Sequence, residues 1–79
     1  MNLLPKNYGI PNINVDVGVL TKREIEIIRY SILPDKELAY QLDMSYFTLL
    51  SHLKNIRNKT GLQGGKELVY FGMKKGLIN

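Results

Sequence analysis

The side chains best suited to recognise another molecule lie between residues 45 and 59. If this segment is helical, one face carries mostly apolar residues at the three- and four-residue spacing of a buried stripe: Leu49, Leu53, Ile56 and Thr60. The opposite face then presents Phe47, Leu50, Ser51, Lys54 and Asn58, with Lys54 at its centre. Such a face suits the major groove of duplex DNA, where base edges offer hydrogen-bonding groups and thymine methyl groups. We therefore expect these five side chains to contact bases.

The cations around this face would meet the phosphate backbone. Arg57 lies at its flank, and Lys59 and Lys36 would lie close by, together with backbone N–H groups at the start of two helices. The formal net charge of +4 falls entirely in the second half, because residues 1–42 hold five basic and five acidic residues, whereas residues 43–79 hold six and two. A basic half suits phosphate binding, although a solvated surface with spare lysines would give the same balance.

The 79-residue chain has the length of one domain and the composition of a globular protein, with 44% hydrophobic residues. A chain this short buries only about 60% of its unfolded surface, so dimerisation would help it. The absence of cysteine excludes disulfides and zinc–thiolate sites and fits a reducing cytoplasm. Pro5 interrupts the apolar start of the chain, and no stretch approaches the ~20 residues that span a bilayer. We expect a cytoplasmic protein with no membrane, metal or cofactor partner.

Catalytic chemistry finds no support in the sequence, which holds no acid–base pair, metal cluster or phosphate-binding loop. His52 is the only histidine. Its position at the border of the buried helix face predicts a packed or phosphate-bonded imidazole rather than a catalytic one. We expect a binding protein and not an enzyme.

Two further helices are expected before residue 45. Thr21 and Glu24 have the spacing of a capping box, so a helix should begin there. Its apolar stripe comprises Ile25, Ile28 and Ile32, with Ile27 beside them. Pro34 should end this helix, because it disfavours the α region at the preceding residue. Asp35 should then cap a short helix over residues 36–42, with its apolar side at Leu38, Ala39 and Leu42.

The segment 45–59 also has the boundaries of a helix. Asp43 and Met44 form a turn, Ser45 caps the helix, and Gly61 stands where a left-handed residue would end it. A short helix, a three-residue turn and a longer helix have the spacing of a helix-turn-helix. A final helix is expected at about 66–75. Its face with Leu68, Val69, Gly72 and Met73 would suit a dimer interface.

Residues 1–19 read as an irregular arm outside the main core, since they contain three glycine or proline breaks before Gly18. Within the arm, Ile13, Val15, Val17 and Val19 alternate with polar residues or glycine, which is the period of a half-buried strand. One strand alone is not stable. It would lie on the helices, pair with a second copy or remain loose, and the sequence does not choose among these.

The residues from Leu20 to Ile78 resemble the LuxR/GerE-type DNA-binding domain. The matching segments are Leu20-Thr21-Lys22-Arg23-Glu24, Lys36-Glu37-Leu38-Ala39, Leu42-Asp43-Met44-Ser45, Thr48-Leu49, His52-Leu53, Asn55-Ile56, Lys59, Glu67-Leu68-Val69 and Gly76-Leu77-Ile78. The resemblance covers nearly the whole chain, as in the stand-alone members of the family. It implies an all-α, four-helix domain over residues 20–79 that dimerises through its last helix and binds two half-sites in duplex DNA.

Residue by residue, the resemblance implies base contacts at Leu50, Ser51 and Lys54. It also implies phosphate contacts near Thr48, Lys36 and Lys59. The chain departs from the family at a few positions: Leu50 replaces a usual lysine, Gly65 a usual arginine, Thr60 a usual core leucine, and Ile32 a frequent glycine. Leucine can touch a thymine methyl group but cannot donate to guanine, so we expect a different sequence preference.

Two other functions remain open at this point. Leu50, Phe47 and the N-terminal arm would also suit an interaction module that pairs with a second protein regulator and inhibits it. A fragment resembling sigma-factor region four shares the Lys-Glu-Leu-Ala segment and the helix-turn-helix, but the fourth helix and the Gly76-Leu77-Ile78 ending argue against it. The leading hypothesis is a homodimeric, sequence-specific DNA-binding transcription regulator.

Overall fold

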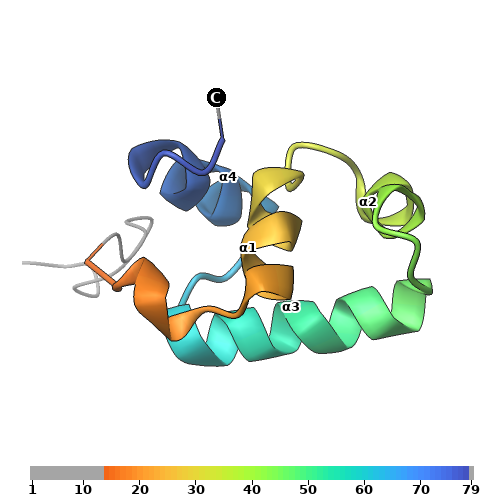
Figure 1. Cartoon of the computed structure of the whole chain (residues 1–79), viewed down its shortest axis with the longest axis horizontal. Helices are drawn as coiled ribbons and strands as arrows, with labels where there is room; N and C mark the ends of the chain where they lie inside the picture. The colour runs from red at the N-terminus through yellow and green to blue at the C-terminus, as the bar shows by residue number, and fades with distance from the viewer. Residues whose placement is uncertain (1–13, 79) are drawn as a thin grey trace, which may run out of the picture.

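The computed structural model describes residues 14–78, and the predicted all-α, four-helix class is confirmed there. A 3-10 helix, η1 (Val17–Val19), precedes four α-helices: α1 (Lys22–Arg29), α2 (Asp35–Gln41), α3 (Tyr46–Thr60) and α4 (Gly65–Lys74). Within the described part of the chain there is no strand. Figure 1 shows α3 running along one side of the molecule, with α2 over its N-terminal end and α1 between α3 and α4. Helix α1 contacts both α3 and α4, and α2 contacts α3.

Helix α1 begins where the sequence predicts but ends earlier. The capping box is present, since the Glu24 N–H donates to Thr21 Oγ1 and the Thr21 N–H donates to Glu24 Oε1. Ile27 and Ile28 are fully buried. The expected continuation to Pro34 is wrong, because the helix ends at Arg29 and the next residues form turns closed by Ile28 and Tyr30 carbonyls. Ile32 is therefore outside the stripe and 61% exposed.

Helix α2 also starts differently from the prediction. Pro34, not Asp35, occupies the N-cap position, and no side chain caps this helix. Pro34 has the extended backbone that an N-cap residue needs, so Asp35 becomes the first helical residue, where its charge still favours the helix dipole. The predicted apolar side is confirmed, because Leu38, Ala39 and Leu42 are all buried.

The turn between α2 and α3 is tight. Asp43 has a φ of 54°, in the left-handed region that aspartate tolerates better than most residues. The Met44 N–H donates to the Ala39 carbonyl, and Ser45 Oγ accepts from the Thr48 N–H. Both predicted boundaries of α3 are confirmed, since Ser45 caps its start and Gly61, with a φ of 76°, ends it.

The buried core joins residues from all four helices: Leu20, Ile27, Ile28, Leu38, Ala39, Leu42, Leu49, Ile56, Leu62, Leu68 and Phe71. Thr60 is buried among them, and its hydroxyl donates to the Ile56 carbonyl and accepts from the Leu62 N–H. Both of its hydrogen bonds stay within the local chain, so a threonine fits this apolar position without an unsatisfied polar group.

The stretch before α1 is not a strand where the structure describes it. Asp16 Oδ1 accepts from the Gly18 N–H, which closes a turn into η1. Val15 and Val17 pack against the helical core, so this part of the expected arm lies on the domain. Val19, the next residue of the predicted alternation, is 48% exposed, and Ile13 lies outside the described residues.

At Gly72, helix α4 lies close to both α1 and the C-terminal segment. A Cβ atom at this position would lie 2.6 Å from Ile78 Cδ1 and 3.0 Å from Ile28 Cγ2. The Gly72 carbonyl also accepts from the Leu77 and Ile78 N–H groups, as the chain turns back at Gly76. The absence of a side chain at Gly72 lets the C-terminal segment cover the core.

We predict that Gly72→Ala destabilises the protein. Overpacking costs about 1–3 kcal/mol, while the better helix propensity of alanine returns up to about 1 kcal/mol. The expected net loss of about 1–2 kcal/mol corresponds to a fall in Tm of roughly 4–16 °C for a domain of this size. Thermal unfolding followed by circular dichroism measures the change.

Gly65→Ala is the matched control, because Gly65 lies in the same helix and a Cβ atom there meets nothing within 4 Å. Its stability should be unchanged or slightly raised. Equal effects of the two substitutions would contradict the assigned role of Gly72.

Candidate nucleic-acid interface

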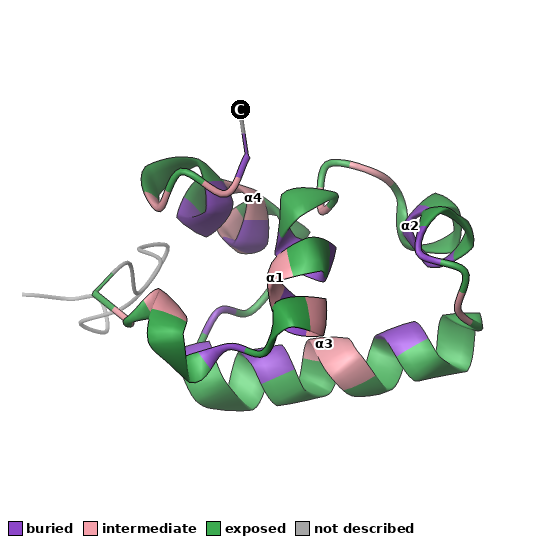
Figure 2. Cartoon of the chain, in the orientation of Figure 1, coloured by how far each residue is buried: buried purple, intermediate pink, exposed green. Residues whose placement is uncertain are grey.

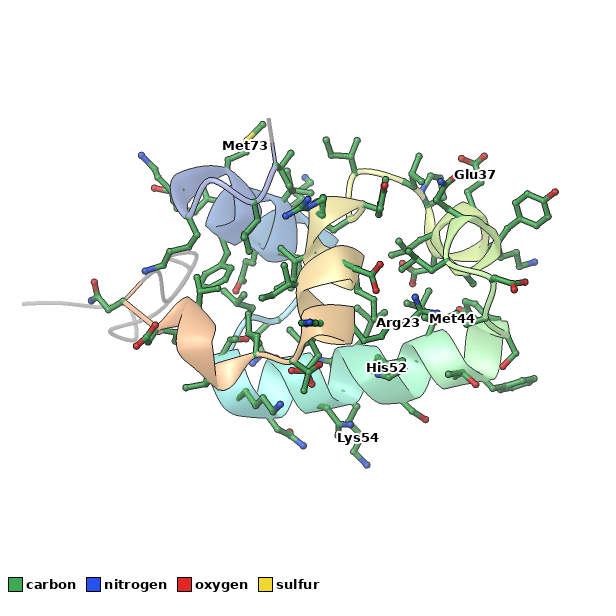
Figure 3. All side chains as sticks on the ribbon, in the orientation of Figure 1. Arg23, Glu37, Met44, His52, Lys54 and Met73 are labelled. Carbon is green, nitrogen blue, oxygen red and sulfur yellow. The ribbon has the colours of Figure 1, made fainter. Side chains whose placement is uncertain are left out.

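The outer face of α3 is exposed along its length. The five residues predicted to contact bases are all exposed: Phe47, Leu50, Ser51, Lys54 and Asn58. Phe47 is 79% exposed and Leu50 39%, whereas Leu49 and Ile56 on the opposite face are fully buried. Figure 2 shows the exposed side of α3 turned away from the other helices, and in Figure 3 Lys54 points outward from it. The predicted division of α3 into a buried and an outer face is therefore correct.

The N-terminal end of this face is aromatic and apolar. The rings of Tyr46 and Phe47 meet edge to face, with centroids 6.2 Å apart. Both side chains and Leu50 are exposed in the described chain. The outer face of α3 thus changes in character along its axis, from apolar at Phe47 and Leu50 to cationic at Lys54.

The cations near this face divide into two kinds. Lys36, Lys54 and Arg57 are exposed, and within residues 14–78 none of them is paired with a carboxylate. Arg57 lies on the α2 side of α3, where it lines an open cavity of about 250 Å³ together with Asp35. Thr48 is exposed in the first turn of α3, and its hydroxyl accepts from Ser45 Oγ. These four residues can meet an anionic surface alongside α3.

Lys59 is of the other kind. Its ammonium donates to Glu24 Oε1 at 2.8 Å, and the Glu24 side chain is 4% exposed. The same oxygen accepts from the Thr21 N–H at 2.9 Å. Lys59 itself is 35% exposed, so its charge is held against α1 at the edge of the core. Lys59 thus forms an ion pair within the fold, and its phosphate contact stays a prediction.

The environment of Glu24 favours its charged form. Burial by itself raises the pKa of this carboxyl group. The hydrogen bonds from Lys59 and Thr21, together with the charge of Lys59, outweigh burial and hold the pKa of Glu24 below its ordinary value. Glu24 therefore links the start of α1 to the end of α3 as a carboxylate.

A second contact fixes the helix-turn-helix from the side of α2. Arg23 Nη2 donates to the Leu42 carbonyl at 2.6 Å, just before the turn, while Nη1 pairs with Glu26. Figure 3 shows Arg23 reaching from α1 towards this region. No local sequence pattern indicates this contact, because the two residues are 19 positions apart.

The expected dimer face on α4 is divided by the fold. Leu68 and Gly72 are buried in the core of the same chain, Val69 is half-buried, and Met73 is exposed. Figure 3 shows Met73 on the outer side of α4. Only Val69 and Met73 of the four predicted residues reach the surface, and Tyr70 is exposed beside them.

Three further observations concern His52, groups of metal ligands and membrane-spanning helices. His52 is half-buried on α3. Among residues 14–78, no group of three or more potential ligands is placed to hold a metal ion. The same residues contain no helix long and apolar enough to cross a membrane.

A short helix, a tight turn and a long helix with an exposed outer face define a helix-turn-helix protein. Residues 18–71 match the family model for bacterial regulatory proteins of the luxR family. The chain therefore belongs to the luxR family, and its domain is that of a DNA-binding transcription regulator, a class of regulators rather than of enzymes. This confirms the resemblance found in the sequence.

The oxygen regulatory protein NreC of Staphylococcus aureus, in strains bovine RF122 / ET3-1 and MRSA252, is similar to this chain. The identity is 34% over 74 residues, which cover 91% of this chain and 34% of NreC. The chain thus spans about a third of the length of these relatives. No solved structure matches it.

We predict that Lys59→Met destabilises the fold, because it leaves the Glu24 carboxylate buried without its counter-charge. Removing a partner from a buried polar group costs about 1–3 kcal/mol, and the partial exposure of Lys59 places the loss in the lower half of that range. Urea unfolding at pH 7 measures it. An unchanged unfolding free energy would contradict the role of this pair.

The pair should also make stability depend on pH. A carboxyl group with a lowered folded-state pKa stabilises the fold above its unfolded pKa, and this contribution is lost as the pH falls through the folded pKa. Glu24→Gln keeps a side chain that suits the capping box but cannot titrate. Between pH 6 and 3, wild type should therefore lose more stability than Glu24→Gln, and parallel pH curves would contradict the assignment.

Proposed function

We propose that the protein binds duplex DNA as a homodimer and reads sequence by placing α3 of each copy in the major groove. The observation that carries this proposal is the outer face of α3, which is exposed and has unpaired Lys54 at its centre. The family supports DNA binding in general, and the burial pattern supports α3 as the element that enters the groove. The base contacts are Phe47, Leu50, Ser51, Lys54 and Asn58.

The phosphate contacts are made by exposed groups of α2 and α3. Lys36 comes from the first turn of α2, Thr48 from the first turn of α3, and Arg57 from the flank of α3 that faces α2. Lys59 is left out of this set, since its ammonium is held by Glu24. Such contacts position the domain on the duplex, whereas the outer face of α3 selects the sequence.

The dimer contact is made by the exposed part of α4. Met73 and Tyr70 are exposed on α4 and Val69 is half-buried beside them, so these side chains offer an apolar surface. A two-fold dimer would place the two α3 helices in successive major grooves, about 34 Å or ten base pairs apart. The operator would then consist of two related half-sites.

A second candidate function uses the same outer face for a protein partner. Phe47 is 79% exposed and lies beside Tyr46, which suits an interaction module that pairs with another regulator and inhibits it. The unpaired cations around the face favour DNA over this alternative. The two functions are distinguished by binding to duplex DNA at low salt.

We predict that Lys54→Ala weakens DNA binding by roughly 10- to 100-fold at a selected sequence, because a good base contact is worth about 1–3 kcal/mol. Arg57→Ala should weaken binding to selected and unrelated sequences alike and lower the salt slope by about one. Fluorescence anisotropy with a duplex selected from a random pool, over a range of salt concentrations, measures both effects.

Lys66→Ala is the control, since Lys66 is an exposed lysine in the first turns of α4, away from the proposed groove contact. It should leave the sequence preference unchanged. Absence of duplex binding by the wild-type protein at low salt would reject the proposal and favour the protein-partner function. Equal behaviour of Lys54→Ala and wild type would reject the placement of α3.

A further inference from the structure

We infer that the half-site read by this protein carries thymines where Phe47 and Leu50 meet the bases, and that these two side chains recognise the thymine methyl groups. The inference rests on the proposed function, because it assumes that the outer face of α3 lies in the major groove. It adds the kind of base pair that this face selects.

The position of the two apolar side chains along α3 carries the argument. Phe47 and Leu50 lie in the first two turns of the helix, and the first residues of a recognition helix are those that contact base edges. Phe47 shares a helix line with Lys54, and Leu50 shares one with Arg57, because residues seven apart lie two turns apart on one side. Each apolar side chain therefore comes about 10 Å before a cation along the axis.

The chemistry of the major groove then restricts what these side chains can favour. Neither Phe47 nor Leu50 can donate or accept a hydrogen bond, and the thymine methyl is the only apolar group that a base pair presents there. Against guanine or cytosine the same side chains would cover hydrogen-bonding groups and leave them without partners, which costs free energy. The contact thus favours A·T pairs and disfavours G·C pairs at the same positions.

The exposure of the two side chains supports contact in the bound state. Phe47 is 79% exposed and Leu50 39%, so both can lose contact with water when a duplex approaches. Tyr46 meets Phe47 edge to face and limits the directions that the Phe47 ring can take. The nearby unpaired charges on Lys36, Lys54 and Arg57 match an anionic duplex, whereas charged residues are depleted in the core of a protein interface.

The experiment compares selection from two random duplex pools, one synthesised with thymine and the other with uracil. Uracil keeps every hydrogen-bonding group of thymine and lacks only the methyl group. The thymine pool should yield half-sites with A·T pairs at the positions nearest the start of α3, and the uracil pool should lose that preference. For a single selected duplex, each thymine replaced by uracil at these positions should weaken binding about fourfold.

Variants then assign the effect to its side chains. Leu50→Ala should bind thymine and uracil duplexes almost equally at the position facing residue 50, while keeping the response to uracil elsewhere. Leu50→Lys should move the preference at that position from A·T to G·C, because lysine donates to guanine. Ile32→Ala is the control, since Ile32 is 61% exposed and lies outside the helix-turn-helix face. It should retain the full response to uracil.

Four results would overturn the inference. Equal selection from the two pools, or an undiminished uracil response in Leu50→Ala and Phe47→Ala, would show that these side chains do not recognise methyl groups while leaving DNA binding by α3 intact. Failure to bind any duplex at low salt would remove the proposed function itself. Capture of a protein partner that Phe47→Ala abolishes, without duplex binding, would assign the same face to that partner.

Discussion

A buried carboxylate that must be satisfied sets the relation between α1 and α3. Glu24 lies at the edge of the core, where a charge without partners would be costly, and it accepts from the Thr21 backbone and the Lys59 ammonium through one oxygen. The first donor closes the capping box of α1 and the second belongs to the last turn of α3. The Glu24 carboxylate thus caps the start of α1 and forms an ion pair with the last turn of α3. The buried stripe of α3 itself follows from the helical spacing of Leu49, Ile56 and Thr60.

The cations near the helix-turn-helix fall into two groups: some contact other groups of the fold, and others remain unpaired. Lys59 is turned towards α1 and Arg23 reaches the Leu42 carbonyl, so both help to hold the helix-turn-helix together. Lys36, Lys54 and Arg57 remain unpaired within the described chain, and Lys54 lies on the outer face of α3. The buried residues of α3 lie on its inner face, whereas Phe47 and Leu50 are exposed on its outer face. The proposed DNA interface is the outer face of α3, because the residues of its inner face are buried in the core.

Local patterns in the sequence were sufficient for much of this account. The capping box at Thr21, the Ser45 cap, Gly61 and the two faces of α3 depend on residues a few positions apart, and the structure confirms them. The predictions fail in two ways: short turns replace expected regular elements, and contacts between distant segments are not visible in local patterns. Ile32 has helical spacing but follows a helix that ends at Arg29. Before α1, Val15 and Val17 pack on the core from a turn rather than a strand, and Val19 is exposed. The pairing of Lys59 with Glu24, and of Gly72 with Ile78, joins segments that no local pattern relates.

The central claim is that the outer face of α3 is the surface that meets DNA, and NMR tests it most directly. The full chain, labelled with ¹⁵N, is titrated with an unlabelled duplex recovered by selection, and the backbone amide shifts are followed residue by residue. The account predicts the largest changes at residues 46–58, with smaller ones at the start of α2 around Lys36. Amides near Glu24 and Gly72, inside the fold, should change little. The largest shifts at α1 or at the end of α4, with α3 unchanged, would contradict the account.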